Sequence, residues 1–138
     1  MIRNTFRPML VVTENVCAMN RALLAFDGSS KSKEALFLAT YLAEQWHTSL
    51  TVVTVLNKSR MRASIQDYAR AYLELHEVQA DFLVEKGSLS ILHKVIQERG
   101  INLLLMGGYS VSWLEEMTRG SLVNHVLREM KCPVLICR

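Results

Sequence analysis

Leu103-Leu104-Leu105-Met106-Gly107-Gly108-Tyr109-Ser110 is the stretch that decides the fold, because its apolar run ends abruptly in two glycines. A further glycine, Gly120, stands directly before Ser121, where a helical spacing of apolar residues begins. This order predicts a buried strand, a loop and a helix N-terminus, whose free N–H groups bind anions such as phosphate. A plain turn with Ser121 as the N-cap of the helix explains the same residues. Both interpretations stay open on these residues alone.

Upstream of this unit, apolar runs alternate with helical patterns. Strands are expected at residues 22–26, 50–56, 81–85, 102–106 and 134–137. The order of strand, helix and strand requires parallel pairing with right-handed crossovers. The sequence therefore predicts an α/β fold, a doubly wound open sheet of five parallel strands with helices on both faces.

Three helices are expected between these strands. The first has Ser30 or Ser32 as its N-cap and an apolar face toward the sheet. The second is expected at residues 65–78 and the third at 89–99, with Gly100 as its C-terminal stop. The inward face expected for the first helix consists of Ala35, Leu38, Ala39, Leu42, Ala43 and Trp46.

The two ends of the chain share a short sequence pattern, since Pro8 and Pro133 are each followed by four apolar residues. We therefore expect an extra N-terminal edge strand within residues 9–12. The chain then divides into residues 1–19, a strand and linker, and residues 20–138, the domain proper. Residues 1–19 are either the remnant of a preceding repeat or an ordinary edge strand.

Composition narrows the class of protein. The 138 residues are 50% hydrophobic and 21% charged, which is typical of one globular domain. No apolar run approaches the roughly 18 residues of a membrane helix. The net charge of +3 is not gathered in a basic block, so we expect neither membrane nor nucleic-acid binding. Three cysteines without metal or redox spacing indicate a reducing, cytoplasmic location.

Catalytic and metal-binding patterns are weakly represented. The sequence contains no GxxxxGK(S/T) P-loop, no GxGxxG dinucleotide fingerprint and no GxSxG nucleophile elbow. The four histidines lie far apart, and we expect them at the surface or its boundary. We predict no catalytic side chain and no metal ligand.

One spacing adds a resemblance to a known family. Gly107-x2-Ser110-x9-Gly120-Ser121 resembles the ATP-binding signature G-x2-G-x9-G-(S/T) of the universal stress protein family, except that Ser110 replaces the second glycine. The turn Asp27-Gly28-Ser29 and the closing run at residues 132–136 are similar to the family's as well. The resemblance, which covers residues 21–138, implies the adenine nucleotide alpha hydrolase-like version of the predicted fold.

The resemblance also implies ATP as the ligand, with Mg²⁺ on its phosphates. Asp27 would lie near the ribose and adenine, and the main chain of Val55 would contact the adenine edge. Asp27 follows one expected strand and Val55 lies at the end of another, and parallel sheets bind ligands outside the carboxyl ends of their strands. The remaining contacts would come from Met106, Gly107, Ser110, Gly120, Ser121 and Leu122.

Three functions stay open. The first is an adenine-nucleotide binding regulatory domain that acts in stress response, with at most slow ATP hydrolysis. The second is a nucleotide-free dimerisation or scaffolding module of the same family, and the third is an enzyme whose acid, base or nucleophile the sequence does not reveal. Residues 134–137 are expected at a sheet edge, so we predict a homodimer or a tandem pseudo-dimer, with residues 9–12 pairing near that edge.

Overall fold

The computed structural model describes residues 8–12, 18–56, 63–87, 91–107 and 132–137. The predicted strands are all present, with ends that differ from the expected ones by at most one residue. In chain order the elements are β1 (Met9–Val11), β2 (Arg21–Ala25), α1 (Ser30–Trp46), β3 (Ser49–Leu56), the 3₁₀ helix η2 (Ala63–Ile65), α2 (Gln66–Leu75), β4 (Ala80–Lys86), α3 (Ile91–Arg99), β5 (Leu103–Gly107) and β6 (Val134–Cys137).

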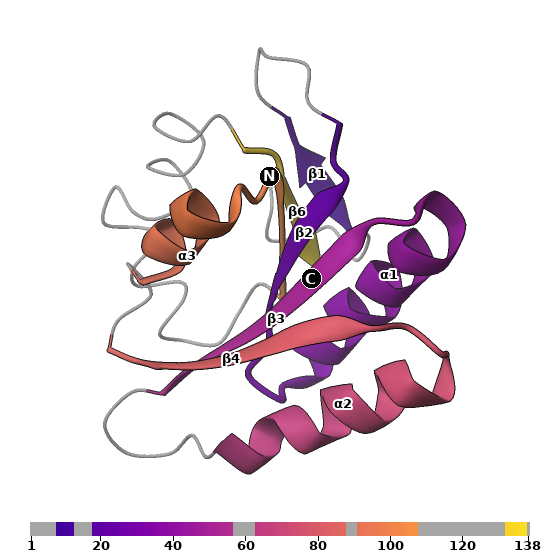
Figure 1. Ribbon diagram of the computed structural model, residues 1–138, viewed down its shortest axis with the longest axis vertical. Coiled ribbons are helices and arrows are strands. Elements are labelled where there is room, and N and C mark those ends of the chain that lie inside the picture. Colours follow the sequence, from indigo (N-terminus) through magenta and orange to yellow (C-terminus); the bar gives the residue numbers. More distant parts are fainter. Residues whose placement is uncertain (1–7, 13–17, 57–62, 88–90, 108–131, 138) are drawn as a thin grey trace.

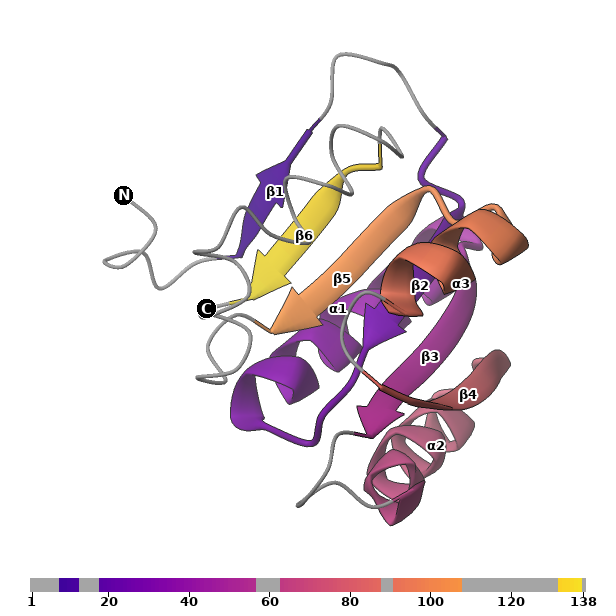
Figure 2. The same cartoon turned by 90° about the vertical axis from the view of Figure 1, so that its left-hand side faces the viewer.

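In the described part of the chain, a sheet of six strands in the order β1-β6-β5-β2-β3-β4 lies at the centre (Figures 1 and 2). The five strands from β6 to β4 pair in parallel, and β1 pairs with β6 in the antiparallel sense. The predicted doubly wound sheet is thus confirmed, and so is the extra N-terminal edge strand. Strand β6 is not the edge that the sequence suggested, because Met9, Leu10 and Val11 pair with it within the chain.

Helices cover both faces of the sheet. Helices α1 and α2 lie on one face and α3 lies on the other, as Figure 2 shows. Two apolar clusters fill these layers, one between the sheet and α1 with α2, the other between the sheet and α3. Strand β5 is buried along its whole length, which explains the unbroken apolar run that identified it.

Two helices differ from the expectation. Residues Ser32, Leu36 and Thr40 of α1 are buried, whereas Trp46, expected to face inward, is 61% exposed at the last position of the helix. Thr40 can be buried because its hydroxyl donates to the carbonyl of Leu36 at 2.8 Å. Helix α2 ends three residues before the expected position 78. Helix α3 stops as predicted, with Gly100 at φ +62°.

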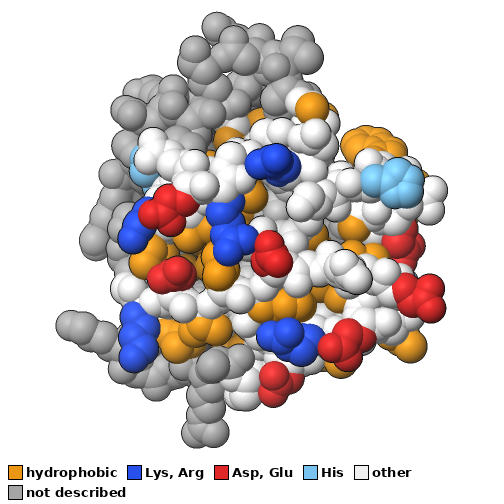
Figure 3. Space-filling model, viewed as in Figure 1, with side chains coloured by type: hydrophobic (Ala, Val, Ile, Leu, Met, Phe, Trp, Pro, Cys, Tyr) orange, Lys and Arg blue, Asp and Glu red, His pale blue; other side chains and the backbone are white. Residues whose placement is uncertain are grey.

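The surface around the edge strand β4 carries both signs of charge. On the face shown in Figure 3, basic and acidic side chains alternate with apolar ones, without a large area of one sign. In the described part of the chain, no helix has the length and hydrophobicity needed to span a bilayer.

Candidate functional site

The carboxyl ends of three neighbouring strands, β5, β2 and β3, meet at one edge of the sheet. Ala25 of β2 pairs with Val53 on one side and with Met106 on the other. Asp27 and Val55 each follow this row by two residues, so the structure brings them to the same edge. This is the edge at which doubly wound sheets bind their ligands.

The remaining predicted residues divide into two groups. Gly107 directly follows the row as the last residue of β5, and the Met106 side chain is fully buried in the core, so Met106 would offer a ligand only its backbone. Four predicted site residues lie outside the described part of the chain: Ser110, Gly120, Ser121 and Leu122.

A tight turn holds Asp27 in place. Its Oδ1 accepts a hydrogen bond from the backbone N–H of Ser29 at 2.8 Å. Gly28 has φ +81°, a left-handed conformation that favours glycine, and a Cβ at this position would lie 3.0 Å from Cγ2 of Ile65. The turn therefore fits closely under the residue that precedes α2.

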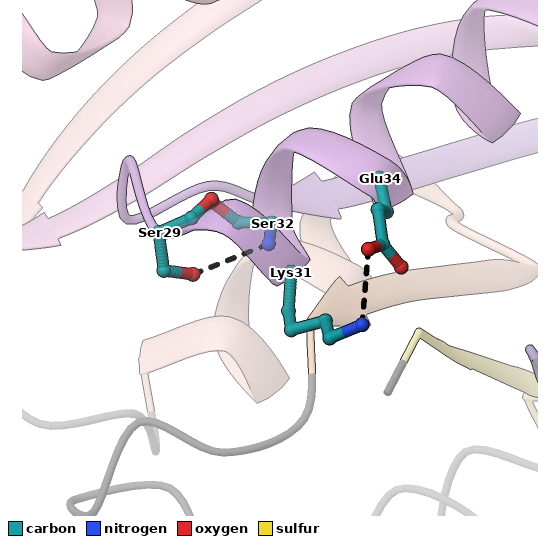
Figure 4. Close-up of polar contacts among 4 residues, drawn as sticks. All are labelled: Ser29, Lys31, Ser32 and Glu34. Carbon is teal, nitrogen blue, oxygen red and sulfur yellow. Dashed lines mark hydrogen bonds and ion pairs between the residues drawn. The ribbon is translucent and has the colours of Figure 1, made fainter. Parts of the chain in front are cut away.

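Ser29 caps helix α1, in place of the expected Ser30 or Ser32. Its side-chain oxygen accepts from the backbone N–H of Ser32 at 3.2 Å, and the Ser32 hydroxyl donates to the Ser29 carbonyl at 2.9 Å. Figure 4 shows this cap beside the ion pair between Lys31 Nζ and Glu34 Oε1, which are 2.9 Å apart. The first turn of α1 therefore has a defined geometry at the site.

Backbone contact joins this turn to β5. A Cβ on Gly107 would lie 2.5 Å from the carbonyl carbon of Lys31 and 2.5 Å from the nitrogen of Ser32. Side chains other than hydrogen do not fit there, so Gly107 has a packing role that is independent of any ligand.

Two hydrogen bonds fix the end of β2 against β3. The backbone N–H of Phe26 donates to the Val53 carbonyl at 2.9 Å, and the buried hydroxyl of Thr54 donates to the Phe26 carbonyl at 2.8 Å. The backbone directly before Asp27 is therefore rigid, as a preorganised site requires.

Cys137 lies at the same edge, paired with Gly107 across β5 and β6. Burial, reinforced by Glu34 and opposed by Lys31, raises the pKa of the Cys137 thiol to about 11. The thiol is therefore neutral at physiological pH, which makes it a poor nucleophile.

Metal-binding geometry is not evident in the described ranges, where no group of three or more His, Cys, Asp or Glu side chains could hold an ion. His76 instead pairs with Glu44, with Nδ1 2.9 Å from Oε1, and His47 is exposed beyond the end of α1. His125 lies outside the described residues.

Sequence reasoning missed Ile65 and Thr54 as parts of the site's framework. Thr54 carried a weak signal, since it is a polar residue inside an apolar strand and the structure buries it completely. Ile65 carried none, because its contact with Gly28 joins segments 37 residues apart in the sequence.

The family model described as the universal stress protein family matches residues 19–91 and 84–138. Universal stress protein YxiE of Bacillus subtilis is 26% identical over 148 residues, covering 86% of this chain and 99% of the relative. Universal stress protein Slr1230 of Synechocystis is 29% identical over 144 residues, covering 99% of this chain but 49% of the relative. A crystal structure of a universal stress protein in complex with cAMP has a TM-score of 0.67 and 22% identity, covering 86% of this chain and 96% of that one.

The fold and the edge at Asp27, Val55 and Gly107 define a doubly wound α/β domain of the kind that binds ligands at the ends of its strands. Within this class, the chain belongs to the universal stress protein family.

Proposed function

We propose that this chain is an adenine-nucleotide binding regulatory domain, with ATP as its ligand, that acts in stress response through dimerisation in the cytoplasm. The observation that carries the proposal is the common edge of β5, β2 and β3, which brings Asp27, Val55 and Gly107 together. The cAMP complex of a related universal stress protein supports an adenine nucleotide as the class of ligand.

The described part of the site fits such a ligand. The turn uses Oδ1 of Asp27, and among the described residues none donates a hydrogen bond to Oδ2. Oδ2 can therefore accept a hydrogen bond from a ribose hydroxyl or an adenine amino group. Val55 is the second-last residue of β3, and its main chain offers a polar edge to adenine. Phosphates, with Mg²⁺ bound to them, would then lie toward Ser110 and the residues Gly120, Ser121 and Leu122.

Dimerisation is proposed at the end of the sheet where β1 and β6 lie, with β1 as the edge strand of this chain. Antiparallel β1 covers β6 within this chain, where a closing strand from another domain would lie in a homodimer or in a tandem pseudo-dimer. The Synechocystis relative is about twice as long as the matched region and covers nearly all of this chain, β1 included. The family model, in contrast, begins at residue 19. Both matches favour residues 1–19 as a segment derived from a preceding repeat.

A nucleotide-free dimerisation or scaffolding module is the second candidate. The observation that favours it is Ser110 in place of the signature's second glycine. Any turnover would be at most slow ATP hydrolysis, as the resemblance to the family implies.

Calorimetric titration of the purified, nucleotide-stripped protein with ATP tests the proposal. Saturable binding of one nucleotide per chain is expected, with affinity reduced on Asp27→Ala. The absence of heat and of nucleotide retention at saturating ATP would favour the nucleotide-free module.

A further inference from the structure

Strands β1 and β6 pair with each other as equivalent strands about a local two-fold axis. Each strand begins directly after a proline, Pro8 or Pro133, and the first residue after one proline pairs with the third after the other. The pairs are Met9 with Ile136, Leu10 with Leu135 and Val11 with Val134. Such a register arises where the same strand of two equivalent units meets itself, as in an isologous interface. Strand β1 therefore pairs with β6 as a second β6 would.

The side chains of the two strands follow the same equivalence on both faces of the sheet. Val11 packs against the apolar cluster beneath α3, which contains Val134 and Ile136. Leu10 points to the other face because side chains alternate along a strand, and its partner Leu135 packs against the cluster beneath α1. Each face of the sheet thus receives from β1 the positions that it receives from β6.

Burial separates the two strands. Val12 is 66% exposed, whereas Cys137, which is likewise the fourth residue after its proline, is fully buried. Leu10 is 47% exposed, whereas Leu135 is partly buried. The reason is that β6 lies between β1 and β5, while β1 is the last of the described strands in the sheet order (Figure 2). Apolar strands in sheets of this class are normally covered on both faces. Strand β1 therefore lacks a neighbouring strand and a covering helix.

The two-fold relation indicates what would cover β1. On its inner side, β6 pairs in parallel with β5, so that Cys137 lies opposite Gly107. Rotation about the axis carries this β5 to the outer side of β1, where an equivalent strand would pair in parallel with residues 9–12. The same rotation carries α1 onto the exposed side chains of Leu10 and Val12. A domain with both a strand and a helix layer therefore fits this edge better than one extended peptide.

A second copy of the chain does not offer this strand, because its own β6 already covers that side of its β5. We propose that residues 9–12 are a donated strand, which closes the sheet of a second domain of the same α/β fold that lacks a closing strand of its own. The proposal rests on the proposed association at this end of the sheet and names the partner there. Strand β1 then pairs on both of its sides, and one sheet runs through both domains.

A tandem chain tests the donated strand. A second copy of residues 20–132 is placed directly before Pro8, so that residues 8–12 take the place of residues 133–137 of the added copy. Every described residue of the original chain is retained. The added copy should fold and add its own signal to the far-ultraviolet circular dichroism, and the tandem should sediment as a monomer. A control tandem carries the complete residues 20–138 before Pro8 and so has a closing strand of its own. Folding of the control alone, with the added residues 20–132 unfolded, would overturn the proposal.

Val12→Asp tests the contact with the second domain. In the original chain this side chain is mostly exposed, so the equilibrium constant for unfolding in urea should change by less than about twofold. In the tandem, Val12 takes the place of the fully buried Cys137, so the substitution should raise the unfolding constant of the added copy by more than about tenfold. Val84→Asp is the matched control, at a 42% exposed apolar position of β4 at the other end of the sheet, and should act alike in both chains. Equally small effects of Val12→Asp in both chains would refute the contact.

The donated strand and the proposed function can fail separately. Folding of the added copy is measured without nucleotide, and sedimentation of the original chain measures its dimerisation independently. Self-association of the original chain that Val12→Asp weakens, with the added residues 20–132 unfolded in the tandem, would instead indicate that β1 pairs with β1 of a second copy. The donated strand would then be wrong, whereas the proposed dimerisation would stand.

Discussion

The backbone nitrogen of Ser32 lies 2.5 Å from the position that a Cβ on Gly107 would occupy. The first turn of α1 and the end of β5 are therefore in direct backbone contact at the carboxyl edge of the sheet. A glycine that the sequence pattern associates with a ligand has, in this structure, a purely steric requirement as well. Variants of Gly107 thus report on packing before they report on binding.

Gly107→Ala should lower the free energy of unfolding by about 1 to 3 kcal/mol, because α1 must shift to admit the methyl group. Urea unfolding followed by circular dichroism measures the change. Met106→Leu is a suitable control, since a swap that conserves volume in the adjacent, fully buried position should cost less than about 1.5 kcal/mol. A loss of less than about 0.5 kcal/mol for Gly107→Ala would contradict the close contact.

Gly28→Ala should also destabilise the fold, for two separable reasons. The left-handed backbone at φ +81° costs an alanine about 1 to 2 kcal/mol, and the new methyl group meets Cγ2 of Ile65. In an Ile65→Ala background the steric part should disappear while the backbone part remains, which gives a coupling of about 0.5 to 1 kcal/mol in a double-mutant cycle. Ile65→Val is the control, because valine keeps methyl groups at the contact. Additive effects in both backgrounds would refute the steric part.

The fold could be predicted from the sequence because its strongest signals are local. Runs such as that ending at Met106 are long, apolar and closed by turn residues, so the strand positions follow from the sequence pattern alone. The face of α1 could not be predicted as well, since Trp46 continues the helical spacing but lies at the end of the helix, 61% exposed. The position of β1 was predicted only from the short pattern of a proline and four apolar residues that both ends of the chain share. Its antiparallel pairing with β6 has no local signal in the sequence.

At the site, too, the features with a local sequence signal could be predicted and those made by distant segments could not. Asp27 and Val55 were placed by the ends of predicted strands, which a parallel sheet necessarily gathers at one edge. The contact of Ile65 with Gly28 and the steric role of Gly107 both depend on contacts between distant segments. The residues next to them in the sequence do not predict these contacts. Ser110, Gly120 and the rest of the signature stay predictions from the sequence.

Deletion of residues 1–19 should increase self-association. Without β1, the outer edge of β6 exposes backbone N–H and C=O groups together with apolar side chains, which favours pairing with another chain. Sedimentation velocity across a concentration series measures the change. Deletion of residues 1–7 is the control, because it leaves β1 in the chain. A truncated protein that sediments as the full-length protein does would count against β6 as an association edge.

Cys137 should stay protonated until the solution is strongly alkaline. Because burial raises its pKa to about 11, the ultraviolet difference titration between wild type and Cys137→Ser should show a thiolate step near pH 11 in the folded protein, against about 8.5 in denaturant. The free energy of unfolding should therefore fall as the pH rises from about 8.5 toward 11, because the unfolded chain loses the thiol proton before the folded protein does. Tyr72, whose pKa is raised mainly by burial and further by Glu44, adds a loss in the same direction. The comparison with Cys137→Ser isolates the thiol, and a thiolate step below pH 9 in the folded protein would disprove its shielding.

Nucleotide affinity should respond to the signature in a defined direction. If position 110 needs a left-handed backbone, serine costs about 1 to 2 kcal/mol, so Ser110→Gly should tighten ATP binding by about tenfold. Gly120→Val should abolish binding, because a branched side chain blocks the approach of phosphate to the helix N-terminus predicted at Ser121. Calorimetry with ATP measures both, and Leu75→Ser, an 81% exposed position at the C-terminal end of α2, should bind as wild type does. Retention of wild-type affinity by Gly120→Val would place the phosphates elsewhere. Undetectable binding to both wild type and Ser110→Gly at millimolar ATP would instead establish the nucleotide-free module, since restoring the signature glycine would then have failed to restore a site.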